Sequence, residues 1–355
     1  MKTKAYHYLR NSFFVMAFLL FSSIAAYAQV ADTASTAMGP QSIFNTHGSI
    51  AEVQLDVFWY TVYVSGFLLI TVGGVFLYAI FKYKAKPGEN FKVPESSHGS
   101  SAVEVGLIIA SCILLLVIAI PNAKALFMMD GPPEAKKENV LKVVAIGHQW
   151  WWEFQYPELG ITTANELHIP TKRSISVEIR SVDVIHSFWI PQLAGKMDAT
   201  PGQVNRMWLD AKDPGKYYGQ CTEFCGDSHA NMRFLTFAHP ESEFDAWAKA
   251  EKKNAAKAET PSEVNGEAIF MSGCNSCHAI RGTNAVGSKG PDLTHFGSRE
   301  TFGAVMFDNK SEHLFDWIKD PKKMKPGSLM DLNSVNLNLT DKNIHNLVAY
   351  LNKLK

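Results

Sequence analysis

The sequence predicts a multidomain membrane protein: a hairpin of two transmembrane helices, an all-β Greek-key sandwich and an all-α domain. Two long uncharged apolar runs predict the helices, and short alternating segments between Pro and Gly predict the sandwich. Helical patterns from residue 262 to the end predict the third part. The 355 residues include 34 Lys and Arg and 34 Asp and Glu, so the formal net charge is zero. This balance argues against a nucleic-acid partner, which requires a strongly basic surface.

Residues 1–28 are typical of a secretory signal peptide. Lys2, Lys4 and Arg10 precede a short apolar core at 13–21, and residues 26–28 (AYA) provide a small-residue cleavage site. The core is short for a span of about 30 Å, although a retained first helix is the alternative interpretation.

We expect residues 29–123 to form an N-terminal segment and a membrane hairpin, with spans at 57–81 and 103–120. Four lysines between positions 82 and 92 follow the first run, which places the 82–102 loop in the cytoplasm. Pro121 is expected to end the second run, and the rest of the chain then lies outside the cell.

Residues 124–240 are expected to form the β domain. Residues 174–180 alternate apolar and polar side chains, and 149–156 and 203–209 are further strand candidates. Residues 241–261, rich in Ala, Lys and Glu, indicate a helical end and a linker. Residues 262–355 form the expected all-α domain, closed by an amphipathic helix at 341–354.

Four of the five cysteines form two close pairs, each with a histidine nearby. In the first, Cys221 and Cys225 precede His229 by eight and four residues, and Met232 follows. Thiolate, imidazole and thioether ligands suit copper in electron transfer. Two thiolates on one loop can bridge two copper ions, whereas a mononuclear copper site needs only one cysteine.

The remaining ligands of this copper site must come from elsewhere. His186, at the end of a candidate strand beside a loop, is the expected second histidine, and the backbone carbonyl of Glu223 is a further weak ligand. Disulfides within the pairs and a zinc site are the competing interpretations. Cys112 lies in an apolar run, where a thiol behaves as a small hydrophobe.

The second pair lies in a C-x-x-C-H motif, the attachment signature for c-type haem. Cys274 and Cys277 are expected to bind the haem covalently, and His278 to be one axial ligand. A methionine is the expected sixth ligand, because it raises the potential of the haem.

Three segments resemble subunit II of cytochrome c oxidases: GHQW at 147–150, DVIHS at 183–187, and GQCTEFCGDSHANM at 219–232. The resemblance covers most of residues 50–240 and implies a dinuclear CuA centre in a cupredoxin domain. It also implies that Trp150 is an electron relay and that the Glu223 side chain helps to hold Mg at the subunit I interface. Glu104 would mark a proton-uptake path. The plainer alternatives are a buried strand aromatic, a solvated loop carboxylate and an interfacial carboxylate.

The segment GPDLT at 290–294 resembles the haem-packing loop of class I cytochromes c, in which the Pro291 carbonyl would orient His278. KPGSLM at 325–330 resembles the distal loop of a cytochrome c fused to some bacterial oxidases, which implies Met330 as the sixth ligand. Met324 and then Met306 are the rivals. Asp331 follows Met330 where that family usually has proline.

These resemblances imply the electron-transfer subunit of a bacterial caa-type haem-copper oxidase in the plasma (inner) membrane, with both soluble domains on the periplasmic or outer face. Electrons would pass from haem c to CuA and on to a catalytic subunit that reduces oxygen to water with proton translocation. This chain would hold no catalytic residue of that reaction. The expected partners are subunit I, other oxidase subunits, lipid, and a donor that is a cytochrome c or a quinol-oxidising complex. An equivalent subunit of a CuA-containing nitric oxide reductase is the alternative.

Overall fold

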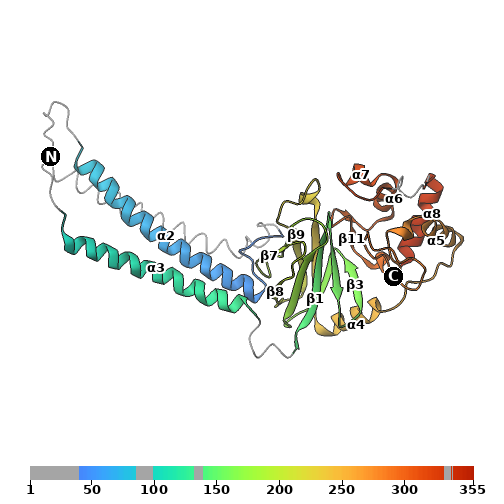
Figure 1. Ribbon diagram of the computed structural model, residues 1–355, viewed down its shortest axis with the longest axis horizontal. Coiled ribbons are helices and arrows are strands. Elements are labelled where there is room, and N and C mark those ends of the chain that lie inside the picture. The colour runs from blue at the N-terminus through green and yellow to red at the C-terminus, as the bar shows by residue number, and fades with distance from the viewer. Residues whose placement is uncertain (1–39, 85–98, 132–138, 332–336, 338) are drawn as a thin grey trace.

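The computed structural model describes residues 40–84, 99–131, 139–331, 337 and 339–355, and the expected signal peptide lies outside these ranges. Three parts follow one another along the molecule: two long helices side by side, a β-sandwich, and a group of short helices at the C-terminal end (Figure 1). This arrangement confirms the predicted fold class.

The paired helices are α2, Ser49–Lys82, and α3, Ser101–Met129, and both are long and apolar enough to cross a membrane. Helix α2 begins before the apolar run because Asp210 of the sandwich accepts hydrogen bonds from the backbone nitrogen (2.7 Å) and hydroxyl (2.8 Å) of Ser49. Gly48 directly precedes the helix at a position that has no room for a side chain, since a Cβ there would lie 2.1 Å from the Leu193 carbonyl oxygen. The sandwich therefore holds the start of the first helix directly.

Pro121, which was expected to end the second apolar run, does not end the helix, because α3 continues through Pro121 to Met129. Proline removes one helical hydrogen bond, but contacts with the sandwich and with α2 hold the last two turns. Ala125 is buried, the Trp208 indole donates to the Met128 carbonyl (3.1 Å), and Gln54 contacts the Met129 sulfur (3.7 Å). Tertiary packing of these residues outweighs the free-energy cost of a proline inside the helix.

Two five-stranded sheets form the sandwich. The first sheet has the order β3 (Ile161–Ala164), β2 (Trp151–Tyr156), β1 (Leu141–His148), β5 (Ile175–Ser181) and β8 (Asn205–Leu209). The second has the order β4 (Glu166–Pro170), β10 (Arg233–His239), β9 (Gly215–Cys221), β6 (His186–Trp189) and β7 (Lys196–Ala199). Trp152 and Phe154 of the first sheet meet Phe188 and Phe234 of the second edge to face in the buried core.

Helix α4, Glu241–Glu251, occupies the first half of the expected helical end and linker. Its Trp247 stacks on His168 of β4, with ring centroids 4.3 Å apart, and Phe244 is buried in the sandwich core. The helix is therefore packed on the β domain.

The C-terminal domain packs its own apolar core between helices. Its elements are α5 (Pro261–Met271), η3 (Cys274–Ser276), η4 (Phe296–Ser298), β11 (Thr301–Phe302), β12 (Phe307–Asp308), α6 (Ser311–Lys319), α7 (Pro321–Met324) and α8 (Asp341–Lys353). Thr260 and Glu263 form a capping box at the start of α5. A Cβ on Gly266 would lie 2.1 Å from the Asn346 carbonyl oxygen, so glycine permits the close crossing of α5 and α8.

Candidate metal and haem sites

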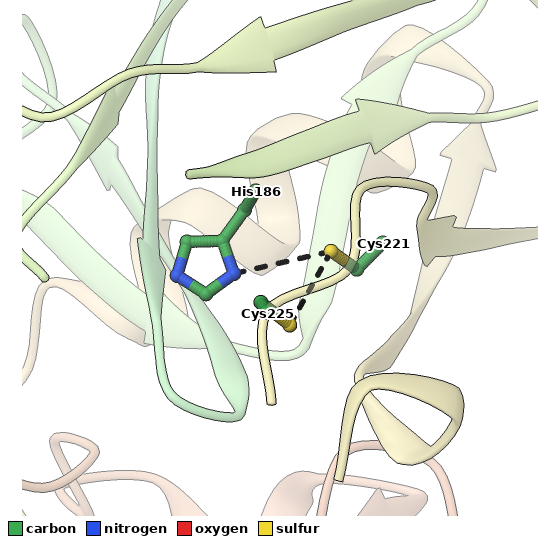
Figure 2. Close-up of side chains that lie close together, drawn as sticks. All are labelled: His186, Cys221 and Cys225. Atoms are coloured by element: carbon green, nitrogen blue, oxygen red, sulfur yellow. Dashed lines mark hydrogen bonds between the residues drawn. The ribbon is translucent and has the colours of Figure 1, made fainter. Parts of the chain in front are cut away.

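Three sulfur and nitrogen donors meet at one end of the second sheet. His186 is the first residue of β6, Cys221 is the last residue of β9, and Cys225 lies in the loop that follows. The Cys221 sulfur is 3.8 Å from the Cys225 sulfur and 3.9 Å from His186 Nδ1, and all three side chains are buried (Figure 2). Strand pairing of Phe188 with Cys221 fixes the two strands in this register.

The other expected copper ligands lie around the same thiols. Cys225 Sγ is 3.5 Å from His229 Nδ1, at the start of η2 (His229–Asn231), and 3.8 Å from the sulfur of the buried Met232. The Glu223 carbonyl oxygen lies 3.3 Å from Cys221 Sγ. The structure thus brings together all six residues that the sequence pointed to.

Asp183 orients one of these donors and was missed in the sequence as a functional residue. Its carboxylate lies 2.7 Å from His186 Nε2 and accepts hydrogen bonds from the backbone nitrogens of Gln149 and Val184, each 2.7 Å away. Nδ1 of His186 is then left facing Cys221. Burial would lower the pKa of His186, but the Asp183 contact outweighs it and the pKa is raised. An acid three residues before a candidate histidine ligand was the available signal.

The two thiols differ in how easily they lose a proton. The hydrogen bond with Cys225 lowers the pKa of Cys221 to about 3, whereas that same contact with Cys221, together with burial, raises the pKa of Cys225. Two adjacent thiolates repel, so only one forms readily in the protein alone. Two copper cations bound here would supply the positive charge that stabilises both thiolates.

The donor set fits a copper pair better than the competing interpretations. A disulfide requires a sulfur–sulfur distance of about 2.05 Å, and Cys221 and Cys225 are 3.8 Å apart. A structural zinc site uses four ligands, whereas six donors converge here, including a thioether and a carbonyl oxygen. This mixture of donors around two thiols is suited to two copper ions.

The C-terminal domain contains a cavity of about 710 Å³ at its boundary with the sandwich. Both cysteines of the attachment motif, Cys274 and Cys277, line it together with His278 and Met330. Apolar side chains complete much of the wall, namely Phe270, Leu293, Phe296, Phe302, Leu314, Trp317, Ile318, Leu347 and Leu351. A large apolar cavity with this motif at its wall fits a covalently attached haem.

His278 is held in a fixed orientation within that cavity. Its Nδ1 lies 2.8 Å from the Pro291 carbonyl oxygen, as expected, which leaves Nε2 as the coordinating atom. A Cβ on Gly290 would lie 2.5 Å from the His278 ring, so the glycine lets the loop pass close to it. Burial lowers the pKa of His278, which favours the neutral ring that binds iron.

Of the three methionines considered as sixth ligand, Met330 lines the cavity, whereas Met324 and Met306 are not among the described residues of its wall. Asp331, which follows Met330, has its carboxylate 3.1 Å from Lys322 Nζ. Met330 and Asp331 both line the cavity.

Trp150 lies between the two sites. Its indole nitrogen donates to the Cys225 carbonyl oxygen over 3.0 Å, and Gln149 Nε2 donates to the same oxygen over 2.7 Å. Trp150 is buried and also lines the haem cavity. One aromatic side chain thus touches the loop of the copper donors and the wall of the haem cavity.

Contacts between the two soluble domains give several residues a role that the sequence did not assign to them. Lys325 is buried, and burial lowers its pKa to about 7. The Ser228 hydroxyl donates to the Pro326 carbonyl (2.5 Å), and Glu166 of β4 accepts hydrogen bonds from the nitrogen (2.8 Å) and hydroxyl (2.9 Å) of Thr301. The motifs that include Lys325, Pro326 and Ser228 give no sign of these contacts, because the partners lie far away in the sequence.

The two carboxylates with expected ionic roles lie apart from this interface. Glu104 is exposed in the first turn of α3, and Glu223 is half-buried between the two copper-loop cysteines. The neighbouring Phe224 is 78% exposed. The structure places Glu223 where its carbonyl faces Cys221, while an apolar ring beside it projects outward.

A two-helix membrane anchor, a sandwich with two thiols in a six-donor site, and a haem-type domain define a membrane-bound electron-transfer protein. Residues 159–236 match the family model for the periplasmic domain of cytochrome c oxidase subunit II, and residues 263–355 match that for cytochrome c. The chain belongs to the cytochrome c oxidase subunit II family and carries a C-terminal cytochrome c domain.

Full-length relatives support this placement. A cytochrome c oxidase subunit 2 from Alkalihalophilus pseudofirmus is 35% identical over 83% of this chain and 85% of that protein. A cytochrome c oxidase subunit 2 from Bacillus subtilis is 32% identical over 87% of this chain and 90% of that protein. A solved periplasmic domain of subunit II from Bradyrhizobium japonicum is 33% identical, covers 32% of this chain and 93% of that one, and has a TM-score of 0.31.

Family membership establishes the general role of the chain. It is a membrane-anchored subunit with an extracellular domain and an electron-transfer role in a haem-copper oxidase. It carries haem in its cytochrome c domain and CuA-type copper in its subunit II domain, and it forms a complex with subunit I and other subunits.

Proposed function

We propose that this subunit receives single electrons at its own haem c, passes them to the CuA centre, and delivers them to a catalytic subunit that reduces oxygen to water with proton translocation. The position of Trp150 carries the proposal, because this side chain contacts the Cys225 loop and lines the haem cavity. A tethered haem domain replaces a diffusional encounter with a local one of high effective concentration.

In this proposal six residues hold the copper pair: His186, Cys221, Glu223 by its carbonyl, Cys225, His229 and Met232. The two thiolates would bridge the ions, and a pair that shares the electron would need little rearrangement between oxidation states. The chain's contribution is to preorganise the donors. Asp183 holds the His186 ring, and the hydrogen bonds of Gln149 and Trp150 to the Cys225 carbonyl hold the loop.

In the proposed haem site Cys274 and Cys277 would attach the haem, and His278 and Met330 would be its axial ligands. The Pro291 contact fixes the His278 ring, and the apolar wall excludes water from the iron. A histidine–methionine pair raises the potential of the haem. A haem held in this way would accept an electron from a respiratory donor, which is a cytochrome c or a quinol-oxidising complex.

The copper loop is also the proposed exit towards the catalytic subunit. Phe224 offers an exposed apolar ring beside the donors, which suits burial against another subunit. The Glu223 side chain would contribute to a magnesium site at that boundary. At the opposite end of the hairpin, Glu104 lies near the cytoplasmic membrane edge in the proposed topology and would mark the mouth of a proton-uptake path. The host membrane is the bacterial plasma membrane, with both soluble domains on its outer face.

Gas consumption by the complex that co-purifies with this chain tests the proposal. The detergent-extracted complex is supplied with a reduced donor, and oxygen and nitric oxide are measured in separate assays. Cyanide-sensitive oxygen uptake, with haem c and copper reduced before the catalytic subunit, is the expected result. Nitric oxide consumption with little oxygen uptake would instead assign the subunit to a nitric oxide reductase.

A further inference from the structure

The loop that carries the proposed haem methionine lies directly on the copper domain. Gly327 has φ +83°, and a Cβ there would come within 3.0 Å of the Trp150 ring and 2.9 Å of Asp227 Cβ. On the preceding residue, the Pro326 carbonyl accepts a hydrogen bond from Ser228 (2.5 Å). The loop therefore approaches Trp150 so closely that only glycine fits.

Lys325 begins this loop and reaches into the boundary between the domains. It is 4% exposed, and its Nζ donates to the Trp150 carbonyl oxygen over 2.6 Å and to the Gly303 carbonyl oxygen over 3.2 Å. Trp150 belongs to the copper domain, while Gly303 follows β11 of the haem domain. One amine thus joins main-chain carbonyls of both domains.

The chemistry of this contact favours a positional role over a purely stabilising one. Burying an amine is unfavourable unless its donors are satisfied, and both recorded acceptors are neutral carbonyl oxygens. An apolar side chain of similar length would fill the same space without that desolvation cost. The lysine provides what an apolar side chain lacks, which is directional hydrogen bonds to two fixed points.

We propose that Lys325 is a positioning residue for electron transfer, which seats the haem-ligand loop on Trp150 and fixes the haem at one distance from the copper centre. This inference rests on the proposed transfer from haem c to CuA. The inference adds to that proposal the contact that sets the geometry of the electron transfer. The step moves one electron, oxidising the haem and reducing the copper centre by the same amount.

Lys325→Met tests this role in the intact complex, because it keeps the length of the side chain and removes the donors. The haem is reduced by a light pulse, and its reoxidation by the copper centre is followed optically. We expect this rate to fall severalfold, because electron tunnelling weakens steeply as the distance between the haem and the copper centre increases. Pulsed electron paramagnetic resonance should show a broader distribution of haem–copper distances. Lys325→Arg, which retains donors, should restore part of the rate.

Two further measurements separate positioning from general damage. In Lys325→Met the iron–methionine absorption band, the haem potential and the copper spectrum should match those of the unaltered protein. Lys323 is an exposed lysine of the same segment, so Lys323→Met should match the unaltered protein in every property. Gly327→Ala, which would push the loop off Trp150, should slow transfer in the same way and provides a second test if Lys325→Met does not assemble.

An unchanged transfer rate and an unchanged distance distribution in Lys325→Met would overturn the role of Lys325. A raised haem potential that alone accounts for the slower rate, because it reduces the driving force for transfer to the copper centre, would also overturn it. If the unaltered complex itself shows no transfer from haem to copper, the proposed function fails instead, so the two failures are distinguishable.

Discussion

The indole nitrogen of Trp150 donates a hydrogen bond to the carbonyl oxygen of Cys225, 3.0 Å away, while its ring forms part of the haem cavity wall. The contact joins residues 75 positions apart in the chain. It places a buried aromatic side chain between the copper donors and the haem cavity. A path of direct contacts that runs from the cavity through Trp150 to the thiols is therefore short.

Trp150→Phe should slow electron transfer from the haem to the copper centre. The smaller ring loses the hydrogen bond to the Cys225 carbonyl and part of the contact with the haem-ligand loop. Loss of one such bond should lower the free energy of unfolding by about 0.5–1.5 kcal/mol. Stopped-flow absorption of the intact complex measures the rate. Trp247→Phe on α4 is the matched control, and equal slowing in both variants would remove Trp150 from the path.

Asp183→Asn should weaken copper binding without removing a ligand. The amide keeps the size of the side chain but loses the charge that holds His186 Nε2 at 2.7 Å. Changes in groups that orient a ligand typically reduce metal affinity about 10-fold to 100-fold. Competition with a copper chelator, followed by the copper absorption bands, measures the effect. Unchanged affinity would show that the Asp183 contact is dispensable.

Cys221→Ser should abolish the two-copper signal and leave the haem spectrum intact. A serine oxygen does not replace a thiolate bridge, and the haem cysteines lie in another domain. Optical and magnetic spectra of the purified subunit provide the measurement. Cys112→Ser, at an exposed position of α3, should retain both signals. Survival of the copper spectrum in Cys221→Ser would contradict the ligand assignment.

The sequence predicted the three-part fold and the donors from Cys221 to Met232, because those features are local. His186, 35 residues before Cys221, was inferred instead from its place at the end of a candidate strand. Apolar runs, alternating strands, the spacing from Cys221 to Met232 and the C-x-x-C-H motif each lie within a short window. The geometry then adds how these pieces meet, as in the register that places Cys221 opposite Phe188.

The features that the sequence did not reveal depend on partners far away in the chain. In the sequence Lys325 cannot be distinguished from its exposed neighbours Lys322 and Lys323. The fold buries it and brings its amine into a hydrogen bond with the Trp150 carbonyl oxygen. The continuation of α3 past Pro121 depends on Trp208, eighty residues beyond Met128. Propensity alone places the helix end too early, since it does not include such contacts.

Met330→Ala should change the haem ligation and lower the potential of the haem. Loss of the thioether removes the ligand that raises this potential, and the iron–methionine absorption band should disappear. Met324→Ala is the matched control, because Met324 is half-buried in the same segment and is not among the described residues of the cavity wall. A normal potential in Met330→Ala and a lowered one in Met324→Ala would reverse the assignment.

Glu166→Gln should make the stability of the contact between the haem domain and the β-sandwich less dependent on pH. Glu166 is 2% exposed and accepts two hydrogen bonds from Thr301 across the domain boundary. Burial raises the pKa of this carboxyl, and the Thr301 bonds and the Arg299 charge offset that rise only in part. When the domains separate, the carboxyl returns to its ordinary pKa.

The docked state therefore holds the proton of Glu166 more tightly than the separated state. Its contribution to docking is fully present below the ordinary pKa and is lost as pH rises through the raised value. Urea unfolding of the soluble domains between about pH 4 and pH 8 should show this loss in the unaltered chain. Glutamine keeps an acceptor oxygen and has no charge to desolvate, so the Glu166→Gln profile should be flatter. Glu241→Gln, at an exposed position, should leave the profile unchanged, and a Glu166→Gln profile as steep as that of the unaltered chain would refute the assignment.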